Sequence, residues 1–387
     1  MSSSAFSAGC SSLPKLLVRT LALAAVALIS CICTYASPAS HLPASGEVAA
    51  GGSDGTPART EPSFDLRPHI HGALRVRGEA ALDGDERAVR FQVRNARLSL
   101  DGHIAPSISY FLQTDLCDRG KIKILDAWGR IDIIRPLAIQ AGQFRLPFGT
   151  DCFRAPANYI FANRSFIGKQ ICNIRGVGAK VVSSIPVAPA RSATLEAGVF
   201  NPTSMADHDV WVRTLAYAAK LSVPVSRVSL SAGFQSVTPD SLRINRWGAS
   251  VTWTPGPLTF EGEYMYTHYT RSALKATHAW VLWCDYALPV RLGVFNRASL
   301  QARWDAMTPG SSGKRCYVTL PDATVCRTLD VTDPARQRIT LGGTLTYRFR
   351  DVHCDVRLDY EKYFRHRGAV ITPDDADKLL AELVIRF

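Results

Sequence analysis

Beyond its first 36 residues, the 387-residue chain lacks any apolar run long enough to cross a membrane as a helix, which takes about 20 residues. It also has almost no amphipathic helix pattern, because its apolar residues seldom recur at intervals of three to four. These absences exclude a bundle of membrane helices. Any part of the chain that spans a bilayer must therefore be made of strands.

Short catalytic motifs are missing as well. From residue 64 onward the chain has no Gly-x-Ser-x-Gly, His-Glu-x-x-His or Cys-x-x-Cys sequence, the signatures of common nucleophile, zinc and redox sites. His69 and His71 share one face of a predicted strand and could supply a base or two metal ligands. Polar residues that face a water-filled barrel interior need no such role. We therefore predict no enzyme, no metal and no cofactor.

A concentrated basic tract is also absent, although the formal net charge is +12. Scattered arginines without a recognition-helix pattern do not indicate a nucleic-acid partner. The remaining partners for a basic chain are acidic surfaces and small anions.

The N-terminus has the pattern of a secretory signal peptide. Lys15 and Arg19 precede the apolar run 21–29, and small residues follow it. We predict a signal peptide over 1–36, cleaved after Ala36 or Ala39, so that the formal charge falls by two to +10.

An alternative at the N-terminus is a lipoprotein cleavage box, Leu28-Ile29-Ser30-Cys31, which would place a lipid on Cys31. The apolar residues that continue downstream of Cys31 weigh against it. Residues 37–63 are rich in Ser, Ala, Gly and Pro and predict a flexible leader. The folded domain is then 64–387.

From residue 69 onward, apolar and polar residues alternate with period two, as in half-buried strands. In the second run the apolar phase slips near Asn95 and Ala96, which indicates a β-bulge. Sixteen runs are predicted, at 69–78, 89–102, 106–116, 124–133, 137–145, 176–185, 192–200, 210–221, 227–236, 246–254, 258–267, 278–286, 294–305, 337–349, 352–363 and 378–387.

The connections between these runs alternate in length. Those after odd-numbered runs tend to be long and polar, and those after even-numbered runs are short. An outer-membrane barrel with long external loops and tight periplasmic turns has this pattern, whereas a soluble sandwich has no reason to segregate its loops. The chain also ends on Phe387, in apolar phase, which resembles the insertion signal of bacterial outer-membrane barrels. The predicted fold is all-β, a sixteen-stranded transmembrane antiparallel barrel.

The stretch 142–149, Gly-Gln-Phe-Arg-Leu-Pro-Phe-Gly, stands at the end of a predicted strand. It resembles the Gly-Gln-Phe-x-x-Pro-Phe-Gly of the phosphate-selective porin O and P family of Gram-negative outer membranes. The similarity runs from about residue 68 to the C-terminus and is diffuse in the second half. Further stretches that resemble the family in the same order are 96–102, 125–128, 163–165, 175–179, 198–201 and 383–387.

The resemblance implies a homotrimeric porin whose third external loop folds inward and constricts the pore. That loop corresponds to about 146–173, the longest stretch without alternation in the first half of the chain. In this motif we predict structural roles for Gly142, Gln143, Phe144, Pro147, Phe148 and Gly149. Family anion sites use basic residues at the constriction, and the candidates here are Arg145, Arg154, Arg164, Lys169 and Arg175.

The lumen phase of the strands carries charges of both signs. Its basic members include Arg75, Arg77, Lys180, Arg227, Arg303, Arg338 and Arg357. Its acidic members include Asp115, Glu196, Glu261, Glu263, Asp305, Asp355 and Asp359. Nearly balanced rings favour a general porin for small hydrophilic solutes with a mild preference for anions such as phosphate.

Seven of the ten cysteines lie beyond the signal peptide. Cys152 and Cys172 both fall in the predicted constriction loop, and Cys316 and Cys326 both fall in the loop after the thirteenth run. Either pair could close its own loop by a disulfide in an oxidising compartment.

Aromatic residues share the apolar phase near strand ends, where rings settle at membrane interfaces. They include Trp247, Trp253, Trp280, Tyr264, Tyr266, Tyr347 and Phe387. Outer-membrane lipid is therefore a predicted partner. A structural or adhesive barrel with a sealed lumen is the rival hypothesis, and a soluble periplasmic binding protein is a third.

Overall fold

The computed structural model describes residues 66–83, 88–118, 120–189, 191–201, 211–240, 242–319, 325–329, 335–364 and 374–387. The predicted signal peptide and leader lie outside these residues. The described residues belong to a unit that spans Phe64–Phe387. No helix among them is long and apolar enough to cross a membrane.

Strands make up most of this unit. They are β1 (His69–Ala81), β2 (Val89–Ala105), β3 (Ile108–Asp118), β4 (Lys121–Ile134), β5 (Leu137–Arg145), β6 (Arg175–Ala188), β7 (Arg191–Phe200), β8 (Ala216–Val225), β9 (Val228–Val237), β10 (Ile244–Trp253), β11 (Leu258–Tyr269), β12 (Thr277–Leu288), β13 (Arg297–Met307), β14 (Arg315–Thr319), β15 (Val325–Leu329), β16 (Arg336–Phe349), β17 (Val352–Phe364) and β18 (Lys378–Arg386).

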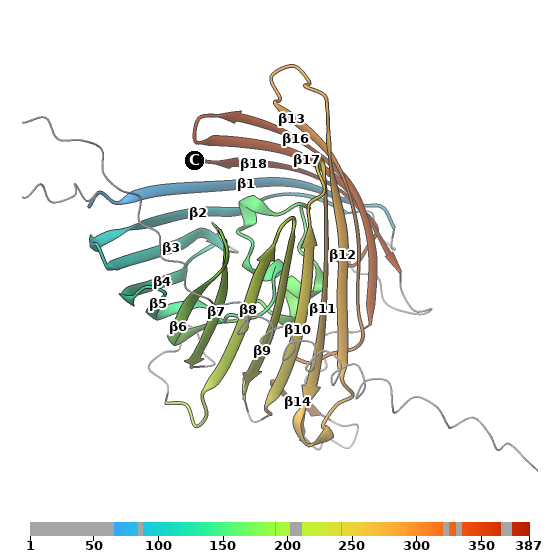
Figure 1. Cartoon of the computed structure of the whole chain (residues 1–387). Coiled ribbons are helices and arrows are strands. Elements are labelled where there is room, and N and C mark those ends of the chain that lie inside the picture. The colour runs from blue at the N-terminus through green and yellow to red at the C-terminus, as the bar shows by residue number, and fades with distance from the viewer. Residues whose placement is uncertain are drawn as a thin grey trace, which may run out of the picture. The chain divides into compact units, whose positions relative to one another are not determined.

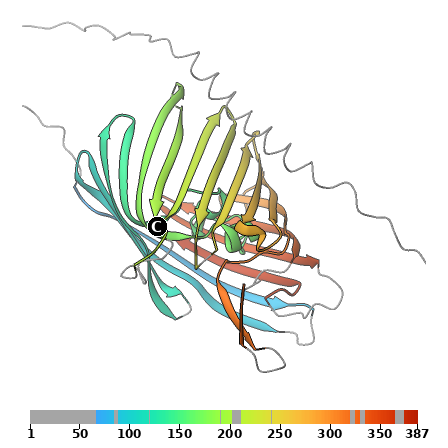
Figure 2. The same cartoon turned by 90° about the horizontal axis from the view of Figure 1, so that it is seen from below.

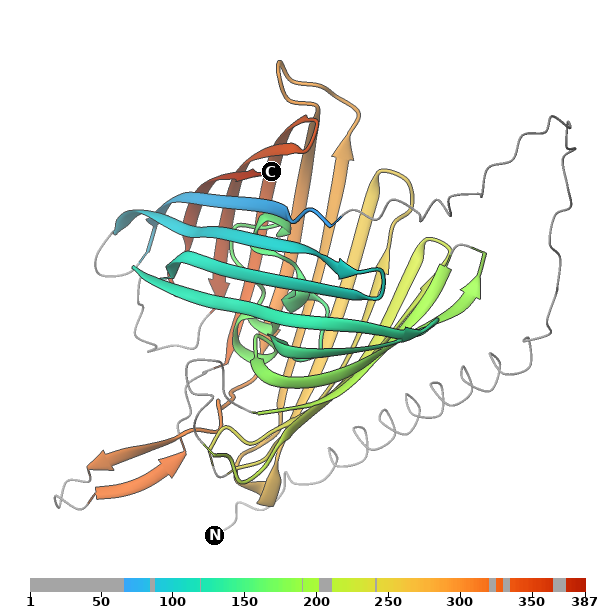
Figure 3. The ribbon, with the colours of Figure 1, turned by 90° about the vertical axis from the view of Figure 1, so that its left-hand side faces the viewer.

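Sixteen of these strands close into one barrel, in which each strand pairs with its neighbours in the chain (Figure 1). β18 returns to β1 in antiparallel register, and β14 with β15 forms a separate hairpin that projects from the barrel (Figure 3). At the seam, the backbone groups of Phe387 and Gly72 exchange two hydrogen bonds of 3.0 and 3.1 Å. The predicted sixteen-stranded antiparallel barrel is confirmed.

The barrel has a polar inside and an apolar outside. On β17, for example, Leu358 is 54% exposed and the next residue, Asp359, is fully buried at 0%. The same contrast holds on β1, where Arg75 and Arg77 are buried and Leu74 is exposed. A soluble sheet would bury its apolar face, so this inverted pattern suits a barrel surrounded by lipid.

Long connections gather at one end of the barrel, here called the long-loop end, and short ones at the other, the short-turn end. Two links are exceptions: the β3–β4 link spans only residues 119–120 at the long-loop end, and the β12–β13 link spans residues 289–296 at the short-turn end. The bulge predicted in the second strand is present. The β1–β2 register shifts between Arg75 and Val76, which face Asn95 and Val93, so that Arg94 is the extra residue.

Aromatic rings form a row across the outer face of five neighbouring strands, β8 to β12. The ring centroids of Tyr217, Phe234, Trp247, Tyr266 and His278 are separated in turn by 6.1, 5.3, 5.7 and 5.2 Å. Trp247 and Tyr266 of this row belong to the predicted interface aromatics, and such rings are typical of barrels at a membrane interface.

A second outward pair, Trp253 and Phe260, stacks at 5.7 Å near the short-turn end. Trp247 and Trp253 lie six residues apart on β10, roughly 20 Å along the strand at ~3.3 Å per residue. The two aromatic levels therefore bracket an apolar band of the outer face.

Candidate functional site

The stretch 142–149 is the point where β5 leaves the sheet. Gly142 has a φ of 132°, and a Cβ there would lie 2.2 Å from the carbonyl oxygen of Ala127. Gly149 has a φ of 82°, a conformation that other residues rarely adopt. The side-chain amide of Gln143 donates to the carbonyl of Leu125 at 2.8 Å. These three residues define the backbone geometry at the end of β5.

The remaining members of the stretch pack the bend. Pro147 has no N–H with which to continue a ladder, and β5 ends at Arg145. The ring of Phe144 meets Phe200 edge-on at 5.4 Å between centroids. Phe148 is completely buried in an apolar cluster with residues of the segment that follows and of β11 to β13.

Residues 146–174, here called the inner segment, lie within the ring of strands (Figures 1 and 2). The segment contains two short 3-10 turns, Asp151–Phe153 and Pro156–Asn158, and one π-helical turn, Ile167–Ile171. Such short turns leave many backbone N–H and C=O groups without partners inside the segment. The barrel wall supplies those partners.

The first part of the inner segment is held by β11. The backbone N–H groups of Thr150 and Asp151 donate to the two carboxylate oxygens of Glu263, at 2.6 and 3.0 Å. The Thr150 hydroxyl also lies 2.9 and 2.8 Å from the hydroxyls of Ser231 and Ser250. This end is therefore fixed to three adjacent strands, β9, β10 and β11.

Acids and arginines together fix the middle of the segment to the arc of the wall from β13 through β18 to β1. The N–H groups of Ala162 and Phe166 donate to Asp359 and Asp305, at 2.6 and 2.9 Å. Wall arginines donate to the segment's carbonyl oxygens: Arg75 and Arg77 to Ala162, Arg303 to Asn163, Arg338 to Arg164 and Arg357 to Ala157.

These wall arginines are also ion-paired with the wall acids. Arg338 meets Asp305 and Glu361 at 2.8 and 2.9 Å, and all three side chains are at most 3% exposed. Arg75 meets Glu382 at 2.6 Å, and both of these side chains are buried as well. The charges of this arc are therefore occupied in holding the inner segment.

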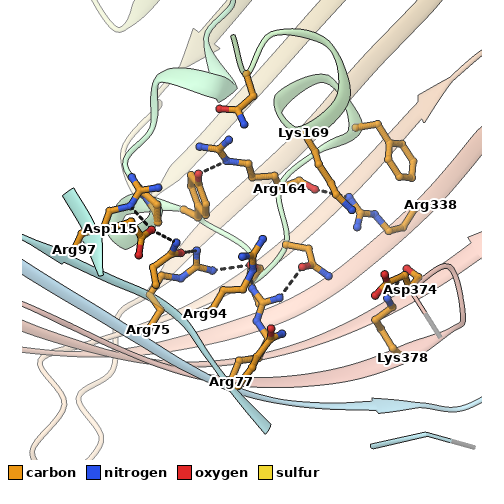
Figure 4. A pocket seen from close by; sticks show the side chains of 18 of the residues that line it. Arg75, Arg77, Arg94, Arg97, Asp115, Arg164, Lys169, Arg338, Asp374 and Lys378 are labelled. Carbon is orange, nitrogen blue, oxygen red and sulfur yellow. Dashed lines mark hydrogen bonds and ion pairs between the residues drawn. The ribbon is translucent and has the colours of Figure 1, made fainter. Parts of the chain in front are cut away.

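Beside the inner segment lies a cavity of about 670 Å³ (Figure 4). Its lining includes thirteen basic and only three acidic side chains, a formal excess of ten positive charges. The basic residues are Arg75, Arg77, Arg90, Arg94, Arg97, Lys123, Arg145, Arg164, Lys169, Arg175, Arg336, Arg338 and Lys378. The acidic residues are Asp115, Asp374 and Asp375. We call this space the basic cavity.

Four of the five predicted anion contacts line the basic cavity: Arg145, Arg164, Lys169 and Arg175. Arg145 donates to backbone carbonyls of the inner segment at Cys152 and Arg154. Arg164 lies over the ring of Tyr159, 4.8 Å from its centroid, and bonds to its hydroxyl.

Lys169 projects from the π-helical turn and is exposed to the cavity. Burial lowers its pKa from the ordinary lysine value of 10.5; the charge of Asp374 opposes this effect, and those of Arg338 and Arg336 add to it. Arg175 forms two bonds to the carboxylate of Asp126, at 3.0 and 3.1 Å.

Arg154 lies elsewhere, and the prediction that it belongs with the other four is not supported. Its guanidinium pairs with Asp151 at 2.9 Å and with Glu261, and it stacks on Trp283 at 5.0 Å. Burial lowers the pKa of Arg154, but the two carboxylates raise it by more. The residue joins the inner segment to β11 and does not line the basic cavity.

Sequence reasoning missed about half of the basic lining. Arg90, Arg94 and Arg97 follow one another along β2, and Lys123 lies on β4. The bulge at Arg94 brings both Arg94 and Asn95 to the cavity, which strict alternation forbids. The phase slip in this run was the one signal in the sequence that could have revealed them.

Buried charges are unevenly placed around the ring, and on β13 to β18 the acids lie among the buried basic residues Arg303, Arg338, Arg357 and Lys378. Buried acids concentrate on β11 to β18: Glu261, Glu263, Asp285, Asp305, Asp355, Asp359, Glu361 and Glu382. Arg227 was also assigned wrongly to the lumen, since it lies exposed in the turn between β8 and β9. Local counting along strands gives the number of charges but not their position around the ring.

Cys152 and Cys172 are buried in the apolar cluster of the inner segment and are free thiols. Burial is the main cause that raises the pKa of Cys172 well above its ordinary value of 9.0, and the nearby Cys152 raises it further. The predicted disulfide between them thus needs no large movement, although it is not formed here. Cys316 faces Thr328 and Cys326 faces Val318 in the β14–β15 register, so the second predicted pair is offset along the hairpin.

The histidines near the short-turn end do not form a metal site. His71 lies 2.8 Å and His69 lies 3.8 Å from the carboxylate of Asp101, with each histidine side chain more than half exposed. No group of three or more metal-ligating side chains occurs among the described residues.

Comparisons with known proteins bear on the fold. No family model and no curated protein matches the chain. An anion-selective porin from Comamonas acidovorans superposes with a TM-score of 0.57 at 11% identity, over 83% of this chain and 98% of the porin. OprB from Pseudomonas putida superposes at 0.56 and 10%, over 82% and 93%.

OmpF from Salmonella typhi gives a TM-score of 0.52 at 10% identity, over 83% of this chain and 97% of OmpF. These solved structures are Gram-negative outer-membrane porins, and at such identities the likeness shows a shared fold. The narrower resemblance to the phosphate-selective porin O and P family stays a prediction.

Proposed function

We propose that the protein is an outer-membrane porin through which small hydrophilic solutes diffuse passively, with a preference for anions such as phosphate. The observation that carries this proposal is the basic cavity beside the inner segment, with thirteen basic and three acidic side chains. Basic groups in a narrow passage attract anions by Coulomb forces, and arginine can offer two parallel donors to one oxyanion.

The site of action follows from the surface. An apolar outer face with two levels of aromatic rings suits lipid, and a cleaved signal peptide would deliver the chain across the inner membrane. The long-loop end is then external, the short-turn end is periplasmic, and the inner segment acts as the constriction. Assembly as a homotrimer is part of the same proposal, because the resemblance to trimeric porins supports it.

Planar-bilayer recording of the purified barrel in a KCl gradient tests the proposal. We expect discrete conductance steps and a reversal potential that favours chloride. A cation-selective reversal potential would overturn the anion preference. A folded barrel that gives no conductance steps would favour the rival function, a structural barrel whose lumen is sealed by the inner segment.

Heat-modifiable migration on a gel is the necessary control for that reading, because folded outer-membrane barrels migrate differently before and after boiling. A missing shift would mean that the preparation is unfolded. Cross-linking in detergent, read against the monomer mass of 42.3 kDa less the signal peptide, tests the trimer.

A further inference from the structure

The three acids of the basic cavity differ in what they do. Asp115 is buried in the wall at 2% exposure and accepts hydrogen bonds from Asn95 at 2.7 Å and Arg97 at 3.1 Å. Its side chain therefore links β3 to β2 within the wall. Asp374 and Asp375 instead precede β18 at the long-loop end, and their side chains are 69% and 33% exposed.

Both of these acids reach basic groups that line the cavity. The carboxylate of Asp374 lies 3.0 Å from the guanidinium of Arg90, and that of Asp375 lies 2.8 Å from Arg336. The ammonium of Lys378 donates to the backbone carbonyl of Asp374 at 2.7 Å. Two carboxylates thus stand among cations at the end of the barrel where we place solute entry.

The charge of Asp374 is maintained by its surroundings. Burial raises the pKa of this carboxyl, but the charges of Arg90, Lys378 and Lys169 lower it by more, so it lies below its ordinary value. The acid is therefore ionised throughout the neutral range. Lys169 belongs to the inner segment, so Asp374 also interacts with the candidate constriction.

The Arg90–Asp374 pair is exposed and the Arg336–Asp375 pair is only partly buried, and such ion pairs are weak because water and salt compete with them. They contrast with the pairs of Arg338, Asp305 and Glu361, which are fully buried. An anion from solution can replace a weakly held carboxylate on Arg90 or Arg336, whereas it cannot replace a buried one.

We propose that Asp374 and Asp375 act as built-in competitors for entering anions: their carboxylates occupy cations at the long-loop mouth of the basic cavity and so limit how strongly it attracts solute anions. This inference rests on the proposed function and adds two residues that set its specificity. Their removal raises the formal excess of positive lining charges from ten to twelve.

The test is the double variant Asp374→Asn, Asp375→Asn in planar bilayers, with inorganic phosphate as a blocker of chloride current. Phosphate added on the long-loop side should block the variant at roughly tenfold lower concentration at low salt, about threefold for each of the two negative charges removed near a cation in water. The shift should vanish at high salt, where screening acts within about 3 Å.

Phosphate added on the opposite side should block the variant and the wild type alike, because the two acids lie only at the long-loop mouth. Asp351→Asn is the matched control, since Asp351 is exposed in the β16–β17 turn, outside the cavity. A double variant that behaves like Asp351→Asn on both sides would overturn the inference while leaving an anion-selective channel.

The charge-retaining variant Asp374→Glu, Asp375→Glu should behave like the wild type. If phosphate blocks that variant at a lower concentration than the wild type, competition by charge is contradicted. Failure of the wild type to conduct would reject the proposed function itself. Heat-modifiable migration confirms that each variant is a folded barrel.

Discussion

Arg145 and Arg175 occupy directly opposite positions on β5 and β6, so two guanidinium groups stand side by side in the wall of the basic cavity. Like charges directly opposed on a sheet are unfavourable unless other groups bind them. Arg175 is bound by Asp126, and Arg145 is bound by carbonyls of the inner segment. The sheet thereby keeps a dense positive charge at the cavity wall.

Replacing Arg145 by Gln removes one of these charges together with a tether of the inner segment. We expect the chloride-to-potassium permeability ratio to fall by about threefold at low salt, from the loss of one charge beside the path. Reversal potentials measure the ratio. Arg227→Gln is the control with equal charge loss at an exposed turn, and an equal fall in both variants would contradict the role of Arg145.

The lowered pKa of Lys169 predicts that anion preference depends on pH. Its pKa is lowered from 10.5, chiefly by burial, so its ammonium loses the proton at lower pH than a free lysine does. Anion preference should therefore decrease as pH rises from neutral towards 10.5. Lys169→Gln should show the lower preference already at neutral pH.

Lys169→Arg is the control for that titration, because arginine stays charged over the same range. Its anion preference should change less with pH than that of the wild type. If wild type and Lys169→Arg have the same pH profile of reversal potential, the decrease belongs to other groups.

Replacing Arg338 is expected to lower the stability of the folded barrel. Its removal leaves the buried carboxylates of Asp305 and Glu361 with one cation fewer, and breaking a buried ion pair costs about 3–5 kcal/mol. We expect Arg338→Met to lower the temperature of heat-modifiable unfolding. Arg130→Met, at the exposed pair with Asp132, should lower it little, since such pairs contribute about 0–1 kcal/mol.

Cys152 and Cys172 predict an intramolecular disulfide in exported protein. Both thiols lie in one buried cluster, and oxidation needs only the loss of two protons and two electrons to a thiol–disulfide oxidant. Unfolding without reductant should leave both cysteines unlabelled by a maleimide, and reduction should expose them. Labelling of both before reduction would show that export leaves them as thiols.

Much of the fold could be predicted from local pattern. Alternation along each strand depends only on neighbouring residues, and sixteen such runs with a terminal Phe387 led to the correct number and pairing order of strands. Pro147 and Gly149 could be assigned to a bend because the missing N–H of proline and the backbone conformation of Gly149 are local properties.

The candidate site was less predictable, because it depends on contacts between distant parts of the chain. Arg75 pairs with Glu382, which lies on the last strand of the barrel. Arg154 lies near Arg164 in sequence, yet it faces Glu261 and not the basic cavity. Arg94 lines the cavity because of a bulge in β2. Simple alternation along a strand does not predict how a bulge changes side-chain direction.

The one-sided lining of the basic cavity has a consequence for the orientation of solutes. The acids of β13 to β18 pair with arginines of their own arc and of β1, so their charges are largely cancelled, whereas the cavity lining carries ten more positive than negative charges. An electric field therefore points from the cavity lining into the lumen. A molecule with separated positive and negative groups is turned so that its negative end faces the cavity lining, and its dipole, in addition to its net charge, decides how it fits beside the inner segment.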